Sequence, residues 1–315
     1  MTVICRTKKE QLNCVLITGG AGLLGSNVIK MFQHQLPGTR IVVVDKTSMP
    51  ANYTAAGVEW MRGDLCNPVL WSELPDEITH ICHLAAKIPW LEKDRNSAQI
   101  VMDNIMPVAF MAENIPRWQY LRGIVFSSSV SVYEANSELL NSTSVVAPRD
   151  LYGTAKIACE TIMKTLSMRS IPVAILRLSS LYGIGQYQGT VLPIMINRAI
   201  HGDAINVYGS GTRTQDFLYC TDAAMAVFLA STKAAAGVFP IGSGTPTTMK
   251  QLAETISSVF AKGRAKIIFS PEKEDGDAGI KVDISEARSI LGYDPQFQLE
   301  AGLCNLRKKM AEVER

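Results

Sequence analysis

Tyr152 and Lys156 stand four residues apart, in a segment whose apolar spacing predicts a helix over residues 151–168. On a helix, residues i and i+4 share a face, so the phenol and the ammonium would lie together. A phenol with a pKa of about 10 is a poor base at neutral pH, but a neighbouring ammonium favours the phenolate. Ser129, expected just past a strand end, is placed to form a hydrogen bond with the substrate oxygen whose proton the phenol would exchange. These residues predict proton exchange with a substrate hydroxyl; the alternative is two solvated residues on one helical turn.

A glycine-rich run follows the first predicted strand. Residues 14–17 are apolar, Gly19, Gly22 and Gly25 follow at G-x-x-G-x-x-G spacing, and residues 23–35 have a helical pattern. The first glycine permits a tight turn, the second lets the backbone approach a pyrophosphate, and the third lets the helix pack on the strand. The helix N-terminus would face the anion with free N–H groups. This pattern predicts a dinucleotide site; the alternative is a glycine-rich turn in an ordinary α/β protein.

An acid follows the second predicted strand. Asp45 comes after the apolar residues 40–44 and lies 20 residues beyond Gly25. A carboxylate there accepts hydrogen bonds from both ribose hydroxyls of an adenosine and repels a 2′-phosphate, so NAD is expected rather than NADP. The positive nicotinamide of oxidised NAD would also favour the phenolate of Tyr152 and help to bring its pKa toward neutrality.

Composition and charge narrow the class of protein. The 315 residues are 47% hydrophobic and 19% charged, with a net charge of +2, so the chain has a substantial core and no general attraction to nucleic acid or membrane. No transmembrane helix or signal peptide is expected. The seven cysteines lack a C-x-x-C pair and are expected to be reduced thiols of a cytoplasmic protein. The four histidines lack metal-ligand spacing, so no metal site is expected.

Alternating strands and helices must position these groups. Strands are expected over residues 14–17, 40–44, 78–84, 121–127 and 173–178, and helices between them over 23–35, 97–114 and 151–168. Near-continuous apolar strands alternating with helices predict a doubly wound α/β fold, a Rossmann-type parallel sheet covered on both faces. Ligands bind such sheets beyond the carboxyl ends of the strands, where Thr18, Asp45 and Ser127 lie.

The second half of the chain has shorter elements and longer loops. Helices are expected over residues 191–200, 221–230, 249–260, 284–291 and 299–314, and a strand over 217–219. An acidic stretch over residues 272–277 is interpreted as a loop that serves as a lid. We expect residues 1–178 to form the NAD-binding domain, with segments near 212–242 returning to it. Residues 179–315 would form a smaller, interleaved α+β substrate-binding lobe.

Several of these stretches together resemble one family. The chain is similar to the extended short-chain dehydrogenases/reductases, in the NAD-dependent epimerase/dehydratase group that acts on sugar nucleotides. The resemblance rests on residues 18–25, 63–65, 84–86, 126–133 and 152–156, and it implies catalytic roles for Ser129, Tyr152 and Lys156. The residues that it and the glycine pattern place on NAD are Gly19, Gly22, Leu23, Leu24, Gly25, Asp45, Asp64, Leu65, Leu84, Ala85, Ala86, Asn104, Ser127, Tyr152 and Lys156.

The residues after Ser129 bear on the reaction. The family's 4,6-dehydratases carry an Asp-Glu pair there to eliminate water, and its decarboxylases carry a Glu at the second position. This chain has Val130 and Ser131. The simplest chemistry is therefore removal and return of a hydride, as in a nucleotide-sugar 4-epimerase. The alternatives are an NAD-dependent dehydrogenase or reductase on an unactivated sugar or other carbonyl compound, and a non-catalytic NAD-binding interaction protein.

The substrate side departs from the family pattern. Ser180 replaces an Asn that contacts the sugar nucleotide, and Gln215 replaces an Arg that grips the diphosphate. Arg213 is placed to compensate, because residues i and i+2 of a strand face the same way. The expected substrate contacts are Lys87, Ser129, Ser180, Val191, Val207, Arg213 and Gln215. The resemblance also implies a homodimer paired through the helices over residues 97–114 and 151–168.

Overall fold

The computed structural model describes residues 13–50, 57–91, 94–134, 139–168, 170–270 and 279–313. The acidic stretch over residues 272–277, interpreted above as a lid, lies outside these ranges. Within them, no helix combines the length and the apolar character needed to cross a membrane.

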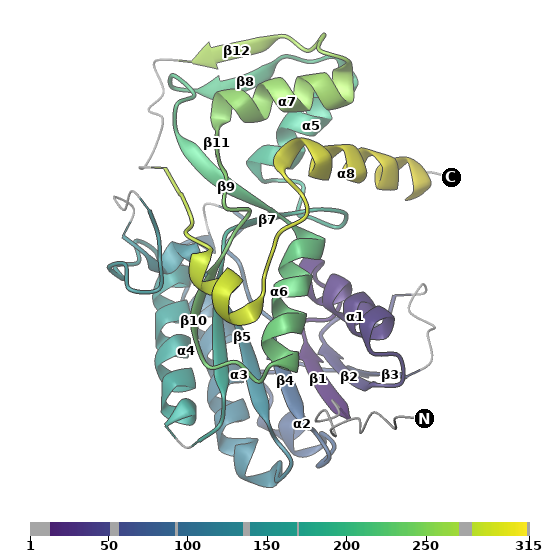
Figure 1. Cartoon of the computed structure of the whole chain (residues 1–315), viewed down its shortest axis with the longest axis vertical. Coiled ribbons are helices and arrows are strands. Elements are labelled where there is room, and N and C mark those ends of the chain that lie inside the picture. Colours follow the sequence, from purple (N-terminus) through teal and green to yellow (C-terminus); the bar gives the residue numbers. More distant parts are fainter. Residues whose placement is uncertain are drawn as a thin grey trace, which may run out of the picture.

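A seven-stranded sheet forms the lower half of the molecule in Figure 1. Its order is β10-β6-β5-β4-β1-β2-β3, and every neighbouring pair is parallel. Its strands are β1 (Cys14–Thr18), β2 (Arg40–Asp45), β3 (Val58–Arg62), β4 (His80–His83), β5 (Gly123–Ser129), β6 (Val173–Leu178) and β10 (Gly237–Ile241). The predicted fold class is confirmed, and the carboxyl ends of β1, β4 and β5 meet at one edge.

Helices cover both faces of this sheet. On one face lie α1 (Leu23–Gln35) and α6 (Cys220–Thr232), and on the other α2 (Pro68–Ser72), α3 (Ala98–Asn114) and α4 (Leu151–Ser167). Strand residues alternate between the faces: Ile17 packs with Phe32 of α1, whereas Leu16 packs with Met111 of α3. Burying one such side chain contributes about 1.5–3 kcal/mol, which explains why these strands are apolar throughout.

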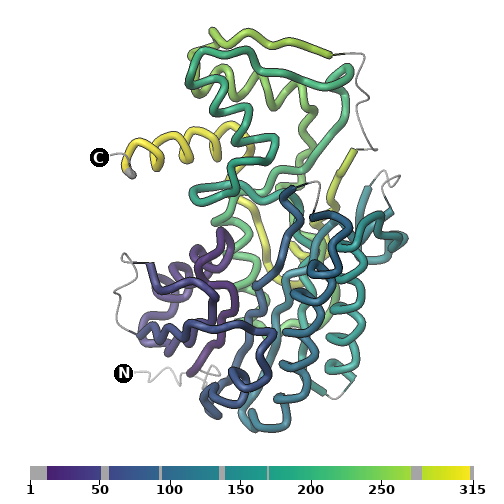
Figure 2. Tube along the Cα trace, turned by 180° about the vertical axis from the view of Figure 1, so that it is seen from behind, coloured from purple at the N-terminus to yellow at the C-terminus, as the bar shows by residue number. Residues whose placement is uncertain are grey.

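The homodimer was predicted to pair through α3 and α4, so the exposure of the apolar residues of these helices bears on it. Figure 2 shows both helices from the side opposite to Figure 1, and they pack directly on each other. Met102 of α3 is half exposed, whereas Ile105, Phe110 and Ile162 are partly buried against the core of their own chain. The homodimer therefore stays a prediction.

Two small sheets and three helices form the upper half of the molecule around a separate core. One sheet has the order β11-β9-β7 and the other pairs β12 with β8. Their elements are β7 (Ser180–Tyr182), β8 (Ile205–Tyr208), β9 (Thr214–Tyr219), β11 (Pro246–Thr248), β12 (Ile267–Ser270), α5 (Val191–His201), α7 (Met249–Ala261) and α8 (Leu299–Val313). A capping box between Thr248 and Gln251 starts α7.

The chain crosses between the two halves repeatedly, because α6 and β10 return to the large sheet after β9. Asp216 of β9 is fully buried where three crossing segments meet. Its carboxylate accepts hydrogen bonds from Ser179 Oγ at 2.7 Å, Ser243 N at 2.8 Å, Ser243 Oγ at 3.2 Å and Gly244 N at 3.1 Å. One carboxylate thus ties β9 to the segments that follow β6 and β10. The domain boundary near residue 178 stays a prediction.

Three predicted positions are corrected. β5 continues to Ser129, so this serine ends the strand instead of following it. The helix expected over residues 284–291 ends in a π-helical turn, Ala287–Leu291. Val207, which the sequence suggests begins a turn-rich stretch, lies instead in β8 with its side chain buried.

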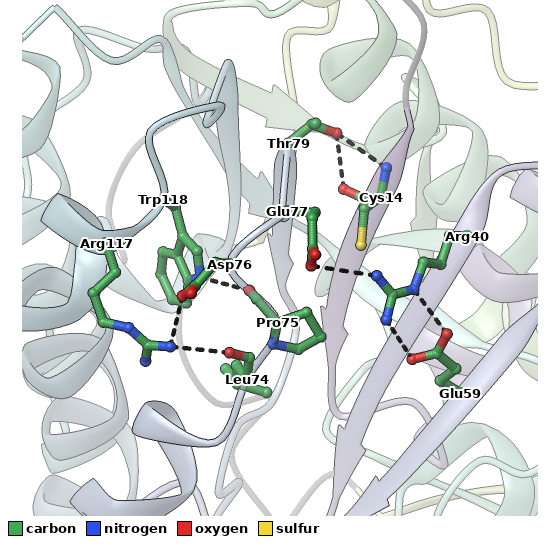
Figure 3. Close-up of polar contacts among 10 residues, drawn as sticks. All are labelled: Cys14, Arg40, Glu59, Leu74, Pro75, Asp76, Glu77, Thr79, Arg117 and Trp118. Carbon is green, nitrogen blue, oxygen red and sulfur yellow. Dashed lines mark hydrogen bonds and ion pairs between the residues drawn. The ribbon is translucent and has the colours of Figure 1, made fainter.

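Polar contacts fix the amino end of the large sheet, opposite to the candidate site. Arg40 at the start of β2 pairs with Glu59 of β3 at 2.7 Å and with Glu77 at 3.5 Å (Figure 3). Arg117 pairs with Asp76 at 2.8 Å and donates a hydrogen bond to the carbonyl of Leu74. These exposed pairs hold strand ends and loops and are worth little individually.

Candidate active site

The glycine-rich turn between β1 and α1 has the shape of a backbone cradle. Gly19 has a φ of +75°, and a Cβ there would lie 2.7 Å from the Cα of Ala85. A Cβ on Gly25 would collide with the carbonyl oxygen of Gly19. Gly22 is the N-cap of α1, and no side chain caps the helix. The first turn of α1, which carries Leu23 and Leu24, therefore points bare backbone at the turn, as the pyrophosphate of NAD requires.

The hydroxyl of Thr18 connects this turn to the next strand. Its Oγ1 accepts hydrogen bonds from the backbone N–H groups of Leu84 at 3.1 Å and Ala85 at 3.2 Å. Its hydrogen is left for His83 Nδ1, 3.0 Å away. Burial, with a smaller effect of Lys156, lowers the pKa of His83 to about 3, so this histidine is neutral. Thr18 and His83 thus fix the strand ends that flank the cradle.

Asp45 lies at the carboxyl end of β2 and contacts the glycine-rich turn directly. Its Oδ2 accepts a hydrogen bond from Ala21 N at 2.9 Å, and its Oδ1 accepts from Thr47 N and Oγ1, both at 2.8 Å. Nearby, Asp64 pairs with Lys46 at 3.2 Å, and Leu65 is buried. Asp45 therefore fixes the glycine-rich turn, and it also lies where an adenosine ribose is expected.

Replacing Asp45 with asparagine is expected to weaken discrimination against NADP. The change keeps the size of the side chain but removes the charge that repels a 2′-phosphate and strengthens hydrogen bonds from the ribose. Loss of a charge-assisted hydrogen bond of about 1.5–3 kcal/mol corresponds to a roughly 10- to 150-fold fall in the ratio of NAD to NADP affinity. Titration calorimetry with both cofactors measures this ratio, and an unchanged ratio would contradict the assignment.

The loop after β4 is fixed by Asn104 of α3. The Asn104 side chain is buried, donates to Lys87 O at 2.9 Å and to Ile100 O at 2.7 Å, and accepts from Lys87 N at 3.2 Å. A direct contribution of Asn104 or Ala86 to cofactor binding stays a prediction. The Asn104 side chain binds the backbone of Lys87 and so holds the loop in place. The Lys87 side chain is exposed. Trp90 in the same loop stacks on Tyr187, with ring centroids 5.0 Å apart.

Tyr152, Lys156 and Ser129 come together where α4 begins and β5 ends. Asp150 caps α4 by accepting a hydrogen bond from Gly153 N at 2.7 Å. Lys156 is buried and donates from Nζ to the carbonyl of Ser127 at 2.7 Å. The same Nζ lies 5.7 Å from the centroid of the Tyr152 ring. The structure therefore places the predicted catalytic pair on one helical face, directly against the serine-rich strand end.

Burial dominates the electrostatics of this pair. It lowers the pKa of Lys156 to about 8, so the amine is still mostly protonated at neutral pH. Burial, followed by Asp150 and Cys159, raises the pKa of Tyr152, and the hydrogen bond from Ser129 lowers it. Lys156 by itself thus does not bring the pKa of the phenol toward neutrality. The sequence prediction assigned that effect to Lys156 and oxidised NAD together. A low pKa for Tyr152 stays a prediction for the enzyme with oxidised NAD.

Three predicted substrate residues form one polar row. Gln215 of β9 donates from Nε2 to Ser180 Oγ of β7, and Arg213 Nη1 donates to Gln215 Oε1 at 3.3 Å. Arg213 Nη2 contacts Met249 Sδ at 3.7 Å. Within the described ranges, no ion pair to an acid is found for Arg213. The row carries one positive charge, on Arg213.

The two valines that were predicted to contact the substrate differ in exposure. Val191 is the first residue of α5 and is partly exposed, so its side chain is accessible. Val207 is buried in the core of the upper half, so only its backbone is available to a ligand.

A buried polar network beside the predicted catalytic pair was not predicted from the sequence. Glu160 accepts hydrogen bonds from Ser128 Oγ at 2.6 Å, Arg177 Nε at 2.9 Å and Arg177 Nη2 at 2.7 Å. Glu160 is 1% and Arg177 2% exposed. The one available signal was spacing, since Glu160 follows Lys156 by four residues on the same helical face. Ser131 donates hydrogen bonds to Ser129. From the sequence, this residue was noted only because dehydratases and decarboxylases of the family carry an acid at its position.

Comparison with known proteins places this geometry in context. The family model described as NAD dependent epimerase/dehydratase family matches residues 15–242. The dTDP-4-dehydro-6-deoxyglucose reductase of Escherichia coli is 30% identical over 316 residues, covering 95% of this chain and 98% of that protein. The dTDP-glucose 4,6-dehydratase of Streptomyces niveus is 27% identical over 303 residues, covering 92% and 90%. The structure of UDP-glucose 4-epimerase from Thermotoga maritima matches with a TM-score of 0.84 at 24% identity, covering 96% and 100%, which shows a shared fold.

Proposed function

The chain belongs to the NAD dependent epimerase/dehydratase family, and on this premise we propose that it is a nucleotide-sugar 4-epimerase of the UDP-sugar type. The observation that carries the proposal is the meeting of Ser129, Tyr152 and Lys156 at one strand end with no acid after the serine. Val130 and Ser131 stand there, and neither can protonate a leaving hydroxyl as a carboxylic acid does. The site therefore has the groups for reversible oxidation of an alcohol but lacks the family's acid pair for elimination of water.

Each residue of the site has a role in this reaction. NAD, when bound, supplies a nicotinamide that accepts a hydride and returns it. Tyr152 takes the proton of the sugar 4-hydroxyl and later gives a proton back to the same oxygen. Ser129 donates a hydrogen bond to that oxygen, and Lys156 provides the nearby positive charge that favours the phenolate. No hydride or proton is gained or lost overall, so a purified epimerase needs no added cofactor.

The polar row of Ser180, Gln215 and Arg213 supports a nucleotide-activated substrate. A diphosphate needs positive charge and hydrogen-bond donors, and Arg213 with the amide of Gln215 offers both. Arginine is suited to this task because its planar fork of donors matches phosphate oxygens.

Replacing Arg213 with glutamine is expected to raise KM for the nucleotide sugar by roughly 10- to 150-fold, the equivalent of one charge-assisted hydrogen bond of about 1.5–3 kcal/mol. Turnover at saturation should change little, because Arg213 is not assigned to the reacting atoms. The matched control is Arg264→Gln, an exposed arginine after α7. A KM unchanged by Arg213→Gln would point away from a diphosphate at this row.

A second candidate is an NAD-dependent reductase of a sugar ketone, which the 30% identity to the Escherichia coli reductase favours. The same three residues serve that reaction, with Tyr152 giving its proton to the new alkoxide. The two candidates differ in their use of cofactor. An epimerase keeps its NAD through every cycle, whereas a reductase consumes NADH in proportion to product.

Proton NMR in D2O tests the proposal directly. The purified protein with NAD is offered UDP-, GDP-, dTDP- and CDP-sugars. Interconversion of two 4-epimers without deuterium uptake supports the epimerase and names its substrate. In a second assay, 4-keto nucleotide sugars are offered with NADH, and turnover in this assay alone overturns the proposal in favour of the reductase. Silence in both assays with cofactor bound overturns both nucleotide-sugar proposals.

A further inference from the structure

The hydroxyl of Ser129 has three polar neighbours. Its Oγ accepts from the backbone N–H of Ser131 at 3.1 Å and from the Ser131 hydroxyl at 2.9 Å. The third neighbour is the Tyr152 side chain, whose pKa is lowered by its interaction with the Ser129 hydroxyl. A serine hydroxyl has one hydrogen and two acceptor positions. Because Ser131 occupies both acceptor positions, the hydrogen of Ser129 is left to point at Tyr152.

The backbone holds Ser131 in this position. Ser129 ends β5 in an extended conformation and caps the short 3-10 helix Val130–Val132 that follows. The first turn of α4 lies against the same segment: a Cβ on Gly153 would be 2.6 Å from the carbonyl oxygen of Ser131. The helix that carries Tyr152 therefore rests on the backbone of Ser131, while the Ser131 side chain reaches Ser129. The two serine hydroxyl groups are thus fixed relative to each other, next to the start of the helix that carries Tyr152.

We propose that Ser131 is a positioning residue, which directs the hydroxyl hydrogen of Ser129 toward the oxygen that Tyr152 and the substrate share. This inference rests on the proposed function, since it takes Tyr152 as the site of proton exchange. A hydrogen bond donated by Ser129 stabilises negative charge on that oxygen, whether phenolate or alkoxide. If Ser129 turned its hydrogen toward Ser131, it would present a lone pair to that charge instead. Ser131 acts through Ser129 and needs no contact with substrate.

Steady-state kinetics of Ser131→Ala provide the first test. The backbone N–H of residue 131 remains, so we expect a moderate, roughly three- to tenfold fall in kcat, the equivalent of one neutral hydrogen bond. KM for the substrate should stay within about twofold. Ser131→Thr keeps the hydroxyl and should restore kcat. An unchanged kcat in Ser131→Ala, or no rescue by threonine, would overturn the proposal.

A double-mutant cycle with Ser129→Ala shows whether Ser131 acts through its neighbour. In the Ser129→Ala background, Ser131→Ala should cause no further loss, because the hydroxyl that it orients is gone. Equal losses in both backgrounds would overturn the proposal and place Ser131 on the substrate itself.

Neutron diffraction from hydrogen-exchanged crystals tests the same point without any substrate. The expected result is the deuterium of Ser131 Oγ directed at Ser129 and that of Ser129 directed at Tyr152. A deuterium of Ser129 that points at Ser131 would overturn the inference. This measurement separates the two proposals, because an inactive wild-type protein with the expected deuterium positions would contradict the epimerase but not the role of Ser131.

Discussion

Replacing Tyr152 with phenylalanine is expected to lower turnover by about 10²- to 10⁴-fold, the range that general acid–base groups contribute. The substitution removes one oxygen and keeps the ring that lies 5.7 Å from Lys156 Nζ. Binding of NAD should persist, because the cradle of glycines and the Thr18 contacts lie on other elements. Turnover is measured under saturating substrate, and bound cofactor is measured separately after denaturation.

The matched control is Tyr120→Phe, which makes the same chemical change on an exposed tyrosine shortly before β5, at the amino end of the sheet. It should leave turnover unchanged. If Tyr152→Phe also retained turnover within about threefold, proton exchange would have to occur at another group, and the roles given to Ser129 and Lys156 would lose their basis.

The second large effect is expected at the buried ion pair of Glu160 and Arg177. Glu160→Ala would leave the guanidinium of Arg177, a residue that is 2% exposed, without its carboxylate partner. Among the described residues, Nη1 of Arg177 already has no hydrogen-bond partner. Breaking a buried pair in this way costs about 3–5 kcal/mol of unfolding free energy. Urea unfolding followed by circular dichroism measures the change.

Two variants give this prediction its controls. Glu59→Ala breaks the exposed pair with Arg40 and should cost at most about 1 kcal/mol. The double variant Glu160→Met with Arg177→Met removes both charges and should cost less than Glu160→Ala alone. Similar losses for Glu59→Ala and Glu160→Ala would mean that Arg177 finds other partners or water.

Local patterns were enough to predict much of the fold and the proximity of Tyr152 and Lys156. The strand, turn and helix around Gly19 to Gly25 are neighbours in sequence, so their arrangement follows from short-range sterics. Tyr152 and Lys156 are four residues apart on one helix, and helical geometry alone brings them together. The helix over residues 23–35 and the strand over residues 173–178 were predicted with the bounds that the structure shows.

Contacts between distant segments could not be predicted in this way. Ser128 and Glu160 are 32 residues apart and meet only because α4 packs across β5. Asp45 was predicted to bind a ribose. Its hydrogen bond from the backbone N–H of Ala21 could not be predicted, because it depends on how β2 lies beside the glycine-rich turn. The pKa of Tyr152 depends on burial, which charge spacing in the sequence does not reveal.

The buried carboxylate of Asp216 has a consequence for how ligands enter and leave. Rotation of the upper half against the large sheet would pull Asp216 away from Ser179, Ser243 and Gly244, and each unsatisfied buried partner would cost about 1–3 kcal/mol. Such a hinge is stiff. Exchange then depends on loops such as those that carry Trp90 and Tyr187, whose stacked rings are both partly exposed and can separate locally. Access to the site would thus be set by loop fluctuations on the nanosecond to microsecond timescale instead of slower domain closure.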